Sequence, residues 1–383
     1  MSTVVDQDVR AGGDPPPGAR APVNRGKADL KKIVFGVVGL VVTVYLMVTA
    51  FQAIVIIDMP KLVQALVAVV AGVGGSMLLF FFLNMAVEGL PQRVEGRLKP
   101  YIFILPAISF IALFLIYPTA QTIVYSFAND DSTGWVGLQN YQDIFGDPDF
   151  RELIFNNVLW IIVVPAATVA LGLMVAVLAD KLSEGWEKTS KSIIFLPMAI
   201  SFVGAATIWR FVYDQDTGDT QVGLLNAIIT AVGLDPVSWL QFSDWNLNDV
   251  LLMVILIWLQ VGFAMVLLSA AIKSVPEETL EAARIDGASE VQTFFRVVVP
   301  QIRGTLVTVF ITVLILVMKV FDVVYVMTNG EFGTNVIGLE FFKQIFQFSN
   351  AGLASAIVVL LMLAVIPVLI YQVRHFREEE ANR

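Results

Sequence analysis

Four residues in a polar stretch of this otherwise apolar chain have side chains suited to binding another protein: Glu278, Glu281, Ala282 and Ala283. The two carboxylates can accept charge-assisted hydrogen bonds from a basic surface. The two alanines are small enough to let another backbone approach closely. The same stretch could instead be an amphipathic connector that rests on lipid headgroups. The residue types alone support these two interpretations equally.

A hairpin of two short helices is the element that must position these side chains. Ser274 followed by Glu277 has the S-x-x-E spacing of a capping box, with Pro276 near the first helical position, so a short helix is expected to begin here. Gly287 is expected to end it.

The second helix of this hairpin has a start signal of its own. Ser289 with Gln292 repeats the box as S-x-x-Q, which predicts a short helix that runs into the next apolar segment at Pro300. Residues 273–303 are therefore expected to form a helix-glycine-helix hairpin on one membrane surface.

Lys319 and Asp322 are the second pair of residues with a possible chemical role, because they stand inside an apolar segment. An ionisable side chain at membrane depth costs about 2.5–3.5 kcal/mol on insertion, and it usually faces a partner or a cavity. A spacing of three places both on one face of a helix, where they can neutralise one another. The pair either forms a structural ion pair or borders a polar path through the membrane.

Several kinds of chemistry lack their residues in this sequence. There is no Cys and there is a single His, His375, so the usual zinc, haem and Ser-His-Asp sites cannot be assembled. No GxxxxGK[ST] loop occurs to hold ATP. The net charge of −9 argues against nucleic acid as a partner. We therefore expect no catalytic residue, no metal site and no cofactor bound by this chain.

The composition places the chain in a membrane. Hydrophobic residues make up 57% and charged residues 15%, against about half and a quarter in a soluble domain. With about 20 apolar residues for each crossing, the sequence predicts an all-α polytopic protein of eight transmembrane helices. Their expected ranges are 33–57, 62–87, 101–126, 154–179, 191–213, 249–272, 305–328 and 352–373.

The distribution of Lys and Arg predicts the orientation of these helices. An even number of crossings places both termini on one side, and cytoplasmic segments carry an excess of positive charge. With cytoplasmic termini, only Lys61, Arg151, Arg210 and Lys343 fall in external segments. Residues 1–30, rich in Pro and Gly, are expected to be a disordered cytoplasmic tail, and 375–383 a second short tail.

The hairpin resembles a known signature. Glu281, Ala282 and Ala283, three residues, Gly287, nine residues and then VVVP at 297–300 match the pattern EAA-x3-G-x9-I-x-L-P of binding-protein-dependent ABC importer permeases. The departures are Val at 297 and Val at 299. In that family the loop is the coupling helix, which sits in a cleft of the ATPase subunit. The resemblance implies a docking core of Glu281, Ala282, Ala283 and Gly287, with Asp286 and Pro300 in the same ATPase-coupling set.

The resemblance extends over about residues 100–374. The segments 105–127, 137–150 and 319–330 look like the carbohydrate-importer branch, whose best-known member is the eight-span maltose permease. It implies a type I importer permease core of six helices over 100–374, with the coupling loop at 273–303 and two extra transmembrane helices at 31–99. The external loop at 128–153 is too short to hold the large external domain of the enteric maltose permease.

Similarity to the maltose permease also implies a set of residues along the substrate path. These are Leu259, Gln260 and Phe263 on the sixth span, and Val313, Leu316, Val317 and Val320 on the seventh. Trp258, near Phe263, and the ionisable pair Lys319 and Asp322 are added to this candidate path. Gln260 could bind a sugar hydroxyl, and Phe263 with Trp258 could stack on a sugar ring, although either aromatic ring could simply pack. The seventh-span valines and leucine replace polar residues of the maltose permease, which predicts a sparse sugar site or one that lies mainly in a partner permease.

The resemblance implies a membrane subunit of an ATP-driven sugar importer in the bacterial cytoplasmic membrane. Its partners would be a second permease, two ATPase subunits that bind ATP and Mg²⁺, and an extracytoplasmic sugar-binding protein. The cargo would be an α-glucoside or a related oligosaccharide, carried by alternating access.

The alternative is an ion-coupled secondary transporter. It would need carboxylates or His within the spans for a proton or sodium relay, and only Asp322 qualifies.

Overall fold

The computed structural model describes residues 28–57, 59–216, 222–242 and 246–381. In these ranges the chain is helical, with one isolated β-bridge between Ala128 and Trp135. Contacts divide the chain into two compact units, Met1–Pro118 and Thr119–Arg383. The predicted tail at 1–30 lies almost entirely outside the described residues.

The first unit consists of long apolar helices. Their bounds are α1 Leu30–Ile56, α2 Lys61–Val69, η1 Val70–Gly74, α3 Gly75–Glu88, α4 Gln92–Ile111 and η2 Ala112–Ile116. The Asp29 carboxylate caps α1 by accepting from the backbone N–H of Lys31 at 3.1 Å. Most apolar side chains of α1 remain exposed, Tyr45 by 68% for example, as expected for a surface in contact with lipid.

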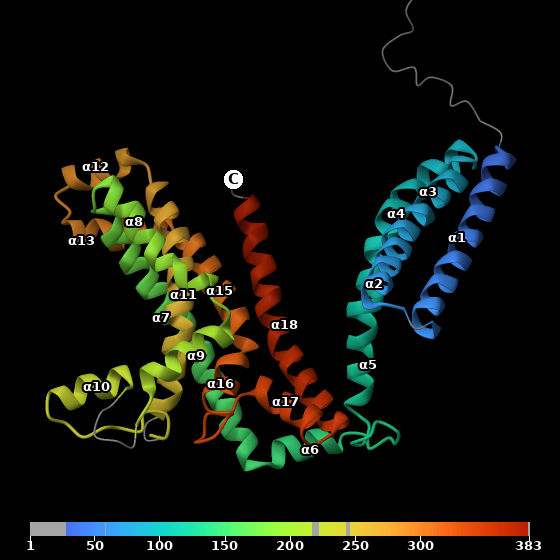
Figure 1. Ribbon diagram of the computed structural model, residues 1–383. Helices are drawn as coiled ribbons and strands as arrows, with labels where there is room; N and C mark the ends of the chain where they lie inside the picture. The colour runs from blue at the N-terminus through green and yellow to red at the C-terminus, as the bar shows by residue number, and fades with distance from the viewer. Residues whose placement is uncertain (1–27, 58, 217–221, 243–245, 382–383) are drawn as a thin grey trace, which may run out of the picture. The chain divides into compact units, whose positions relative to one another are not determined.

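The second unit carries the sites considered below. After α5 Tyr117–Tyr125, which begins at the division between the units, its helices are α6 Gln139–Gly146, α7 Pro148–Asp180, α8 Glu184–Phe195, η3 Leu196–Ala199, α9 Phe202–Tyr213, α10 Leu224–Ala231, α11 Leu247–Lys273, α12 Glu277–Ile285, α13 Glu290–Thr293, η5 Phe294–Val298, α14 Val299–Gln301, α15 Arg303–Met318, α16 Asp322–Met327, α17 Ile337–Phe346 and α18 Ala351–Ala381. In Figure 1 the hairpin of α12 and α13 lies at one end of this unit, and α6, α10 and α17 lie at the other.

Six helical segments of the described chain are long and apolar enough to cross a membrane, and two bent pairs bring the number to eight. The six are α1, α2–α3, α4–α5, α7, α11 and α18, and the bent pairs are α8–α9 and α13–α15. The prediction of an all-α polytopic fold is confirmed. The fifth and seventh predicted spans, however, are not straight helices.

The fifth predicted span, 191–213, bends by 104° between η3 and α9. Pro197 stands in η3, and Ile200 has an extended backbone, so the helix cannot continue through these residues. Ser201 starts the next helix, because its Oγ accepts from the backbone N–H of Gly204 at 3.1 Å. The predicted span is therefore present as two helical parts joined at a bend.

The core of the second unit forms where α7, α9 and α11 meet. Trp160 and Leu252 are completely buried there, and Leu256 almost so. At Gly262 the helix α11 contacts the backbone at the end of α8. A Cβ at this position would stand 2.5 Å from the carbonyl oxygen of Ile194. Only glycine permits so close an approach, so the bent pair α8–α9 is seated directly on α11.

The seventh predicted span, 305–328, is also interrupted. The chain bends by 70° at Ile302, just before α15 begins, and α15 ends at Met318. Lys319 and Phe321 leave the helical backbone before α16 begins at Asp322. The prediction that Lys319 and Asp322 share one face of a continuous helix is therefore wrong.

Candidate functional site

The hairpin between α11 and α15 has the predicted order of elements but a different first cap. Pro276 is the N-cap of α12, and no side chain caps this helix. Ser274 instead donates its hydroxyl to the carbonyl oxygen of Ala271 at 2.7 Å. Val275, the next residue, is buried in an apolar cluster with Val298 and Ile302, and the expected capping box at Ser274 with Glu277 is not formed.

The turn and the second cap follow the prediction. α12 ends with Asp286 as its C-cap, and Gly287 takes φ +80°, the left-handed conformation that glycine adopts without strain. Ser289 then caps α13 in a complete capping box. Its backbone N–H donates to Gln292 Oε1 at 2.9 Å, and the backbone N–H of Gln292 donates to Ser289 Oγ at 3.3 Å.

The outer surface of the hairpin combines exposed apolar side chains with carboxylates. Ile285 is 86% exposed and Val291 66%. Glu281 and Ala282 are exposed on α12, while Ala283 is buried within the hairpin. The small residue that another backbone can reach is therefore Ala282.

The hairpin is seated on the membrane helices by a small apolar cluster. Val275, Val298 and Ile302 are buried there, and Leu173 of α7 packs against them. Lys181 at the end of α7 also lies 3.6 Å from the carboxylate of Glu290 on α13. A displacement of the hairpin must therefore move the ends of α7 and α15 as well.

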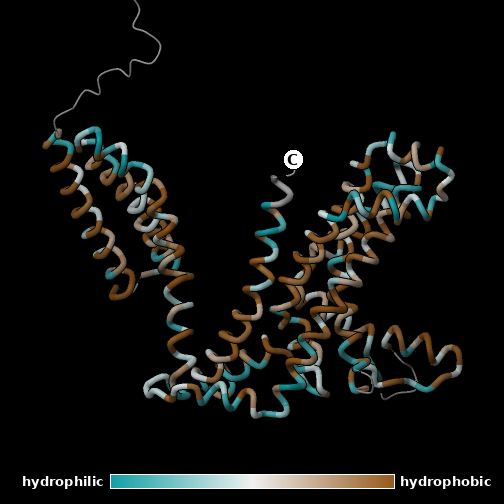
Figure 2. The backbone as a smooth tube through the Cα atoms, turned by 180° about the vertical axis from the view of Figure 1, so that it is seen from behind, coloured by the Kyte–Doolittle hydropathy of each residue, from teal (hydrophilic) through white to brown (hydrophobic). Residues whose placement is uncertain are grey.

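A cluster of charged side chains joins the ends of α7, α8 and α11 beside the hairpin. Lys191 Nζ lies 2.7 Å from Asp180 Oδ1 and 2.6 Å from Glu187 Oε1, and all three side chains are 16–18% exposed. Lys273 pairs with Glu187, and Ser269 donates to Asp180 Oδ1 at 2.9 Å. Figure 2 shows hydrophilic residues gathered at this end of the unit. The cluster fixes three helix ends at one point.

Replacing Lys191 with methionine is expected to destabilise the second unit by roughly 2 kcal/mol, because two largely buried carboxylates lose one of their two charged donors and keep only the more exposed Lys273. The measurement is the melting temperature of the purified protein in detergent. Lys188→Met is the matched control on the same helix, since the pair of Lys188 with Glu184 is exposed and should contribute little. Equal melting temperatures of the two variants would contradict a structural role for the cluster.

A second site lies at the break between α15 and α16. Lys319 and Asp322 line a cavity of about 380 Å³ together with Phe202 of α9 and Leu256 of α11. The described residues show no ion pair between Lys319 and Asp322, although both face the cavity. Of the two alternatives open for this pair, the direct ion pair is therefore not formed. The ammonium group of Lys319 and the carboxylate of Asp322 can therefore each contact a polar ligand in this cavity.

The other path residues suggested by the sequence are placed differently. Leu316 and Val320 line the same cavity. Leu259, Gln260, Val313 and Val317 are buried at 7% exposure or less. Trp258 packs edge to face against Trp209 at 5.9 Å, and Phe263 belongs to a separate apolar cluster. The structure thus brings Leu316, Lys319, Val320 and Asp322 together, and it places the remaining residues in packing contacts.

A polar network far from the hairpin was not foreseen. Asn156 on α7 donates to the carbonyl oxygens of Gly333 at 2.6 Å and Asn335 at 3.1 Å, and Asn248 on α11 donates to Phe332 at 2.8 Å. These bonds hold the loop between α16 and α17. Beside them, Asp249 is fully buried and accepts from Trp160 Nε1 at 3.3 Å.

The sequence signal for this network was the run of polar residues before α11. Asn248 and Asp249 stand at the start of the apolar segment, where the predicted span 249–272 begins. Their burial depends on α7 lying alongside α11, and the local sequence does not show that packing.

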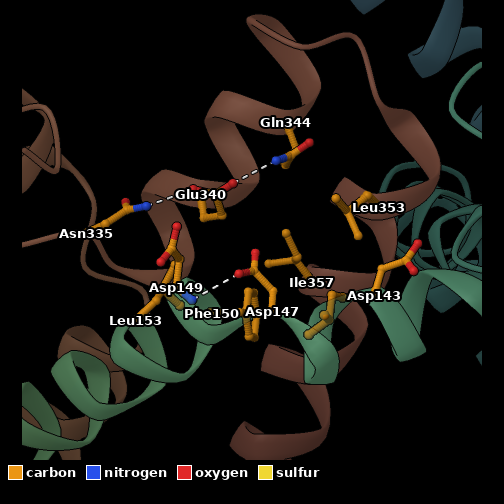
Figure 3. Close-up of a pocket in the computed structure, with 11 residues that line it drawn as sticks. Asp143, Asp147, Asp149, Phe150, Leu153, Asn335, Glu340, Gln344, Leu353 and Ile357 are labelled. Atoms are coloured by element: carbon orange, nitrogen blue, oxygen red, sulfur yellow. Dashed lines mark hydrogen bonds between the residues drawn. The ribbon is translucent and has the colours of Figure 1, made fainter. Parts of the chain in front are cut away.

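An acidic cavity of about 240 Å³ opens at the same end of the unit. Asp143, Asp147 and Asp149 line it, and Glu340 accepts from Asn335 and Gln344 at 2.7 Å each (Figure 3). The cavity is formed by α6, the start of α7, α17 and α18, so helices distant in sequence meet here.

Comparison with known proteins gives consistent matches. Residues 165–377 match the family model described as binding-protein-dependent transport system inner membrane component. The chain is 42% identical to the α-glucoside transport system permease protein AglF of Rhizobium meliloti (strain 1021), over 85% of this chain and 100% of that protein. It is 47% identical to the osmoprotective compounds uptake permease protein GgtC of Synechocystis, over 73% of this chain and 100% of that protein.

Among solved structures, the fold resembles a chain of a bacterial ABC transporter that imports the acidic polysaccharide alginate. The TM-score is 0.64 at 22% identity, and the match covers 75% of this chain and 99% of that chain. At this identity the likeness supports the fold and not a substrate.

Proposed function

We propose, from the premise that the chain belongs to the family of binding-protein-dependent transport system inner membrane components, that it is the permease subunit of an ATP-driven importer of α-glucosides or related oligosaccharides. The sugar class is supported by the relative named for α-glucoside transport, which aligns over its whole length.

The hairpin α12–α13 is the observation that carries this proposal. Its exposed surface combines Glu281 and Ala282 with Ile285, and its base is packed against α7 and the start of α15. An ATPase subunit would bind this surface, with Ile285 in an apolar pocket and Glu281 in contact with basic side chains. Asp286 and Gly287 shape the turn, and Pro300 lies farther along, where α14 leads into the bend before α15.

In the proposed topology the hairpin and both termini are cytoplasmic, in the bacterial cytoplasmic membrane. ATP and Mg²⁺ are bound by two ATPase subunits, and this chain pairs with a second permease. The acidic cavity beside Glu340 then faces outward, where an extracytoplasmic sugar-binding protein delivers the cargo. The cavity at Lys319 and Asp322 is part of the sugar path, with the two charged groups as partners of sugar hydroxyls.

The proposal is tested by purifying the tagged chain from its native membrane in mild detergent, with mass spectrometry of the proteins that accompany it. We expect an ATPase and a second permease with the wild type. The variants Glu281→Lys and Ile285→Asp are expected to lose most of the ATPase, by roughly tenfold or more, because they remove the two kinds of contact at the hairpin. The second permease should remain.

Glu331→Lys is the matched control, since it makes the same charge reversal at an exposed position on the opposite end of the unit. It should retain the ATPase at the wild-type level. If the wild type purifies with no ATPase, the chain is a self-contained carrier and the assignment of the hairpin is wrong.

A further inference from the structure

The short helix α10 has its polar and apolar faces reversed relative to a helix in water. Leu224 and Ile228, one turn apart, are each 55% exposed, and Val232 just beyond the helix is 72% exposed. Asn226, on the opposite side, is completely buried. A helix facing water places its polar residues outward, so the medium around this helix must be apolar.

The buried face of α10 is held rigidly by Asn226. Its Nδ2 donates to the carbonyl oxygens of Asp214 at 2.8 Å and Val237 at 3.0 Å, and its Oδ1 accepts from the backbone N–H of Val237 at 2.9 Å. Trp239 Nε1 also donates to this oxygen at 3.1 Å. The outward direction of the apolar stripe is therefore fixed by four hydrogen bonds.

Length and charge limit what α10 can do. Its eight residues rise about 12 Å, far less than the ~30 Å hydrocarbon core, so the helix cannot cross a bilayer. Residues 222–234 contain no charged side chain. The segment therefore offers no ionic contact to a protein surface and no barrier to entering the apolar edge of a membrane.

The position of α10 in the chain indicates that the apolar surroundings of this helix are lipid. The chain leaves α9 at Tyr213, whose hydroxyl donates to the carbonyl oxygen of Leu251 on α11 at 2.9 Å, so α10 joins the ends of two membrane-crossing segments. Figures 1 and 2 show that α10 extends away from these helix ends, across the direction of α11. The loop that follows α10 lies farther from the α12–α13 hairpin than α10 does. Phe211 near the end of α9 is 67% exposed, so the span that leads to α10 also presents an apolar side chain outward.

We propose that α10 is an interfacial helix that lies in the plane of the membrane surface opposite the hairpin. Leu224, Ile228 and Val232 enter the boundary between headgroups and acyl chains of a lipid leaflet. The helix thereby anchors the following segment, 233–242, at the membrane surface and holds the ends of α9 and α11 at a fixed depth.

Site-directed spin labelling tests this placement, and the absence of native Cys leaves a clean background. Ile228→Cys and Leu224→Cys are labelled with a nitroxide in the full chain, assembled with its partner subunits in lipid nanodiscs. Collision rates are measured with oxygen, which concentrates in the bilayer, and with a water-soluble nickel chelate. Asp235→Cys, exposed on the following segment, is the matched control.

We expect the ratio of oxygen to nickel collisions to be several-fold higher at 228 and 224 than at 235. High nickel accessibility at 228 and 224 would place the helix in water, and low accessibility to both reagents would place it under another protein. Either result overturns the proposal. No transport is measured, so its failure leaves the importer assignment standing.

Discussion

Gly262→Ala is expected to lower the melting temperature of the protein markedly, although it adds a single methyl group. The added Cβ would stand 2.5 Å from the carbonyl oxygen of Ile194 and 2.7 Å from the Cα of Phe195. Both are backbone atoms of the segment that leads into the 104° bend, so no side chain can rotate away. Overpacking of this kind costs about 1–3 kcal/mol. The displaced segment should also weaken transport.

Gly185→Ala is the matched control for this prediction, because a Cβ at position 185 of α8 meets no atom within 4 Å. Alanine favours the helical state over glycine, so this variant should melt at or slightly above the wild-type temperature. The measurement is thermal unfolding in detergent, followed by size-exclusion chromatography of the remaining monodisperse protein. An unchanged melting temperature for Gly262→Ala would show that α8 and η3 are not seated on α11 as described.

The second large effect is expected at the break between α15 and α16. Lys319→Met and Asp322→Asn should each reduce sugar uptake by about tenfold or more, which corresponds to the loss of one hydrogen bond from a charged group, about 1.5–3 kcal/mol. Both side chains line the cavity of about 380 Å³ without pairing to each other. Uptake is measured in proteoliposomes with the assembled transporter and a labelled α-glucoside.

The double variant separates a ligand site from an ion pair. If both groups contact the sugar, Lys319→Met with Asp322→Asn together should transport no better than either single variant. Two groups that merely neutralise one another would instead show recovery in the double variant. Lys343→Met, which changes a lysine of α17 outside this cavity, should leave uptake at the wild-type level.

The sequence was sufficient to predict which segments enter the membrane, because the length of an apolar run is a local property. The helices α7, α11 and α18 contain the predicted ranges, and α1 covers all of its range except residue 57; the ends differ by one to eight residues. The bend near Ile200 had a signal in Pro197, because proline interrupts the hydrogen bonding of a helix. The pattern of hydropathy could not show that the chain would turn by 104°.

The break after Met318 had no such signal, since 305–328 contains neither Gly nor Pro. Its cause is tertiary. Phe321 leaves the helix to pack its ring against Phe342 of α17 at 5.0 Å, and Val320 is buried in the core. Spacing along a helix placed Lys319 and Asp322 on one face, and this inference holds only while the helix continues.

The hairpin was predicted most completely, because its turn and second cap depend on residues that are neighbours in sequence. Gly287 and the Ser289 box formed as expected. Ser274 did not cap α12, because Val275 is buried and the chain enters the helix from Pro276. A capping motif indicates what a side chain can do, and the packing of the residue beside it decides whether it does so.

The 70° bend at Ile302 makes the hairpin and α15 the two arms of a lever. The fulcrum is Ile302 itself, which is buried in the apolar cluster at the base of the hairpin. The longer arm, α15, has 16 residues and so spans about 24 Å, which means that a rotation of about 5° moves its far end by about 2 Å. That far end is Met318, next to Lys319, so a small tilt of the hairpin that turned α15 with it would be amplified at the residues that line the cavity.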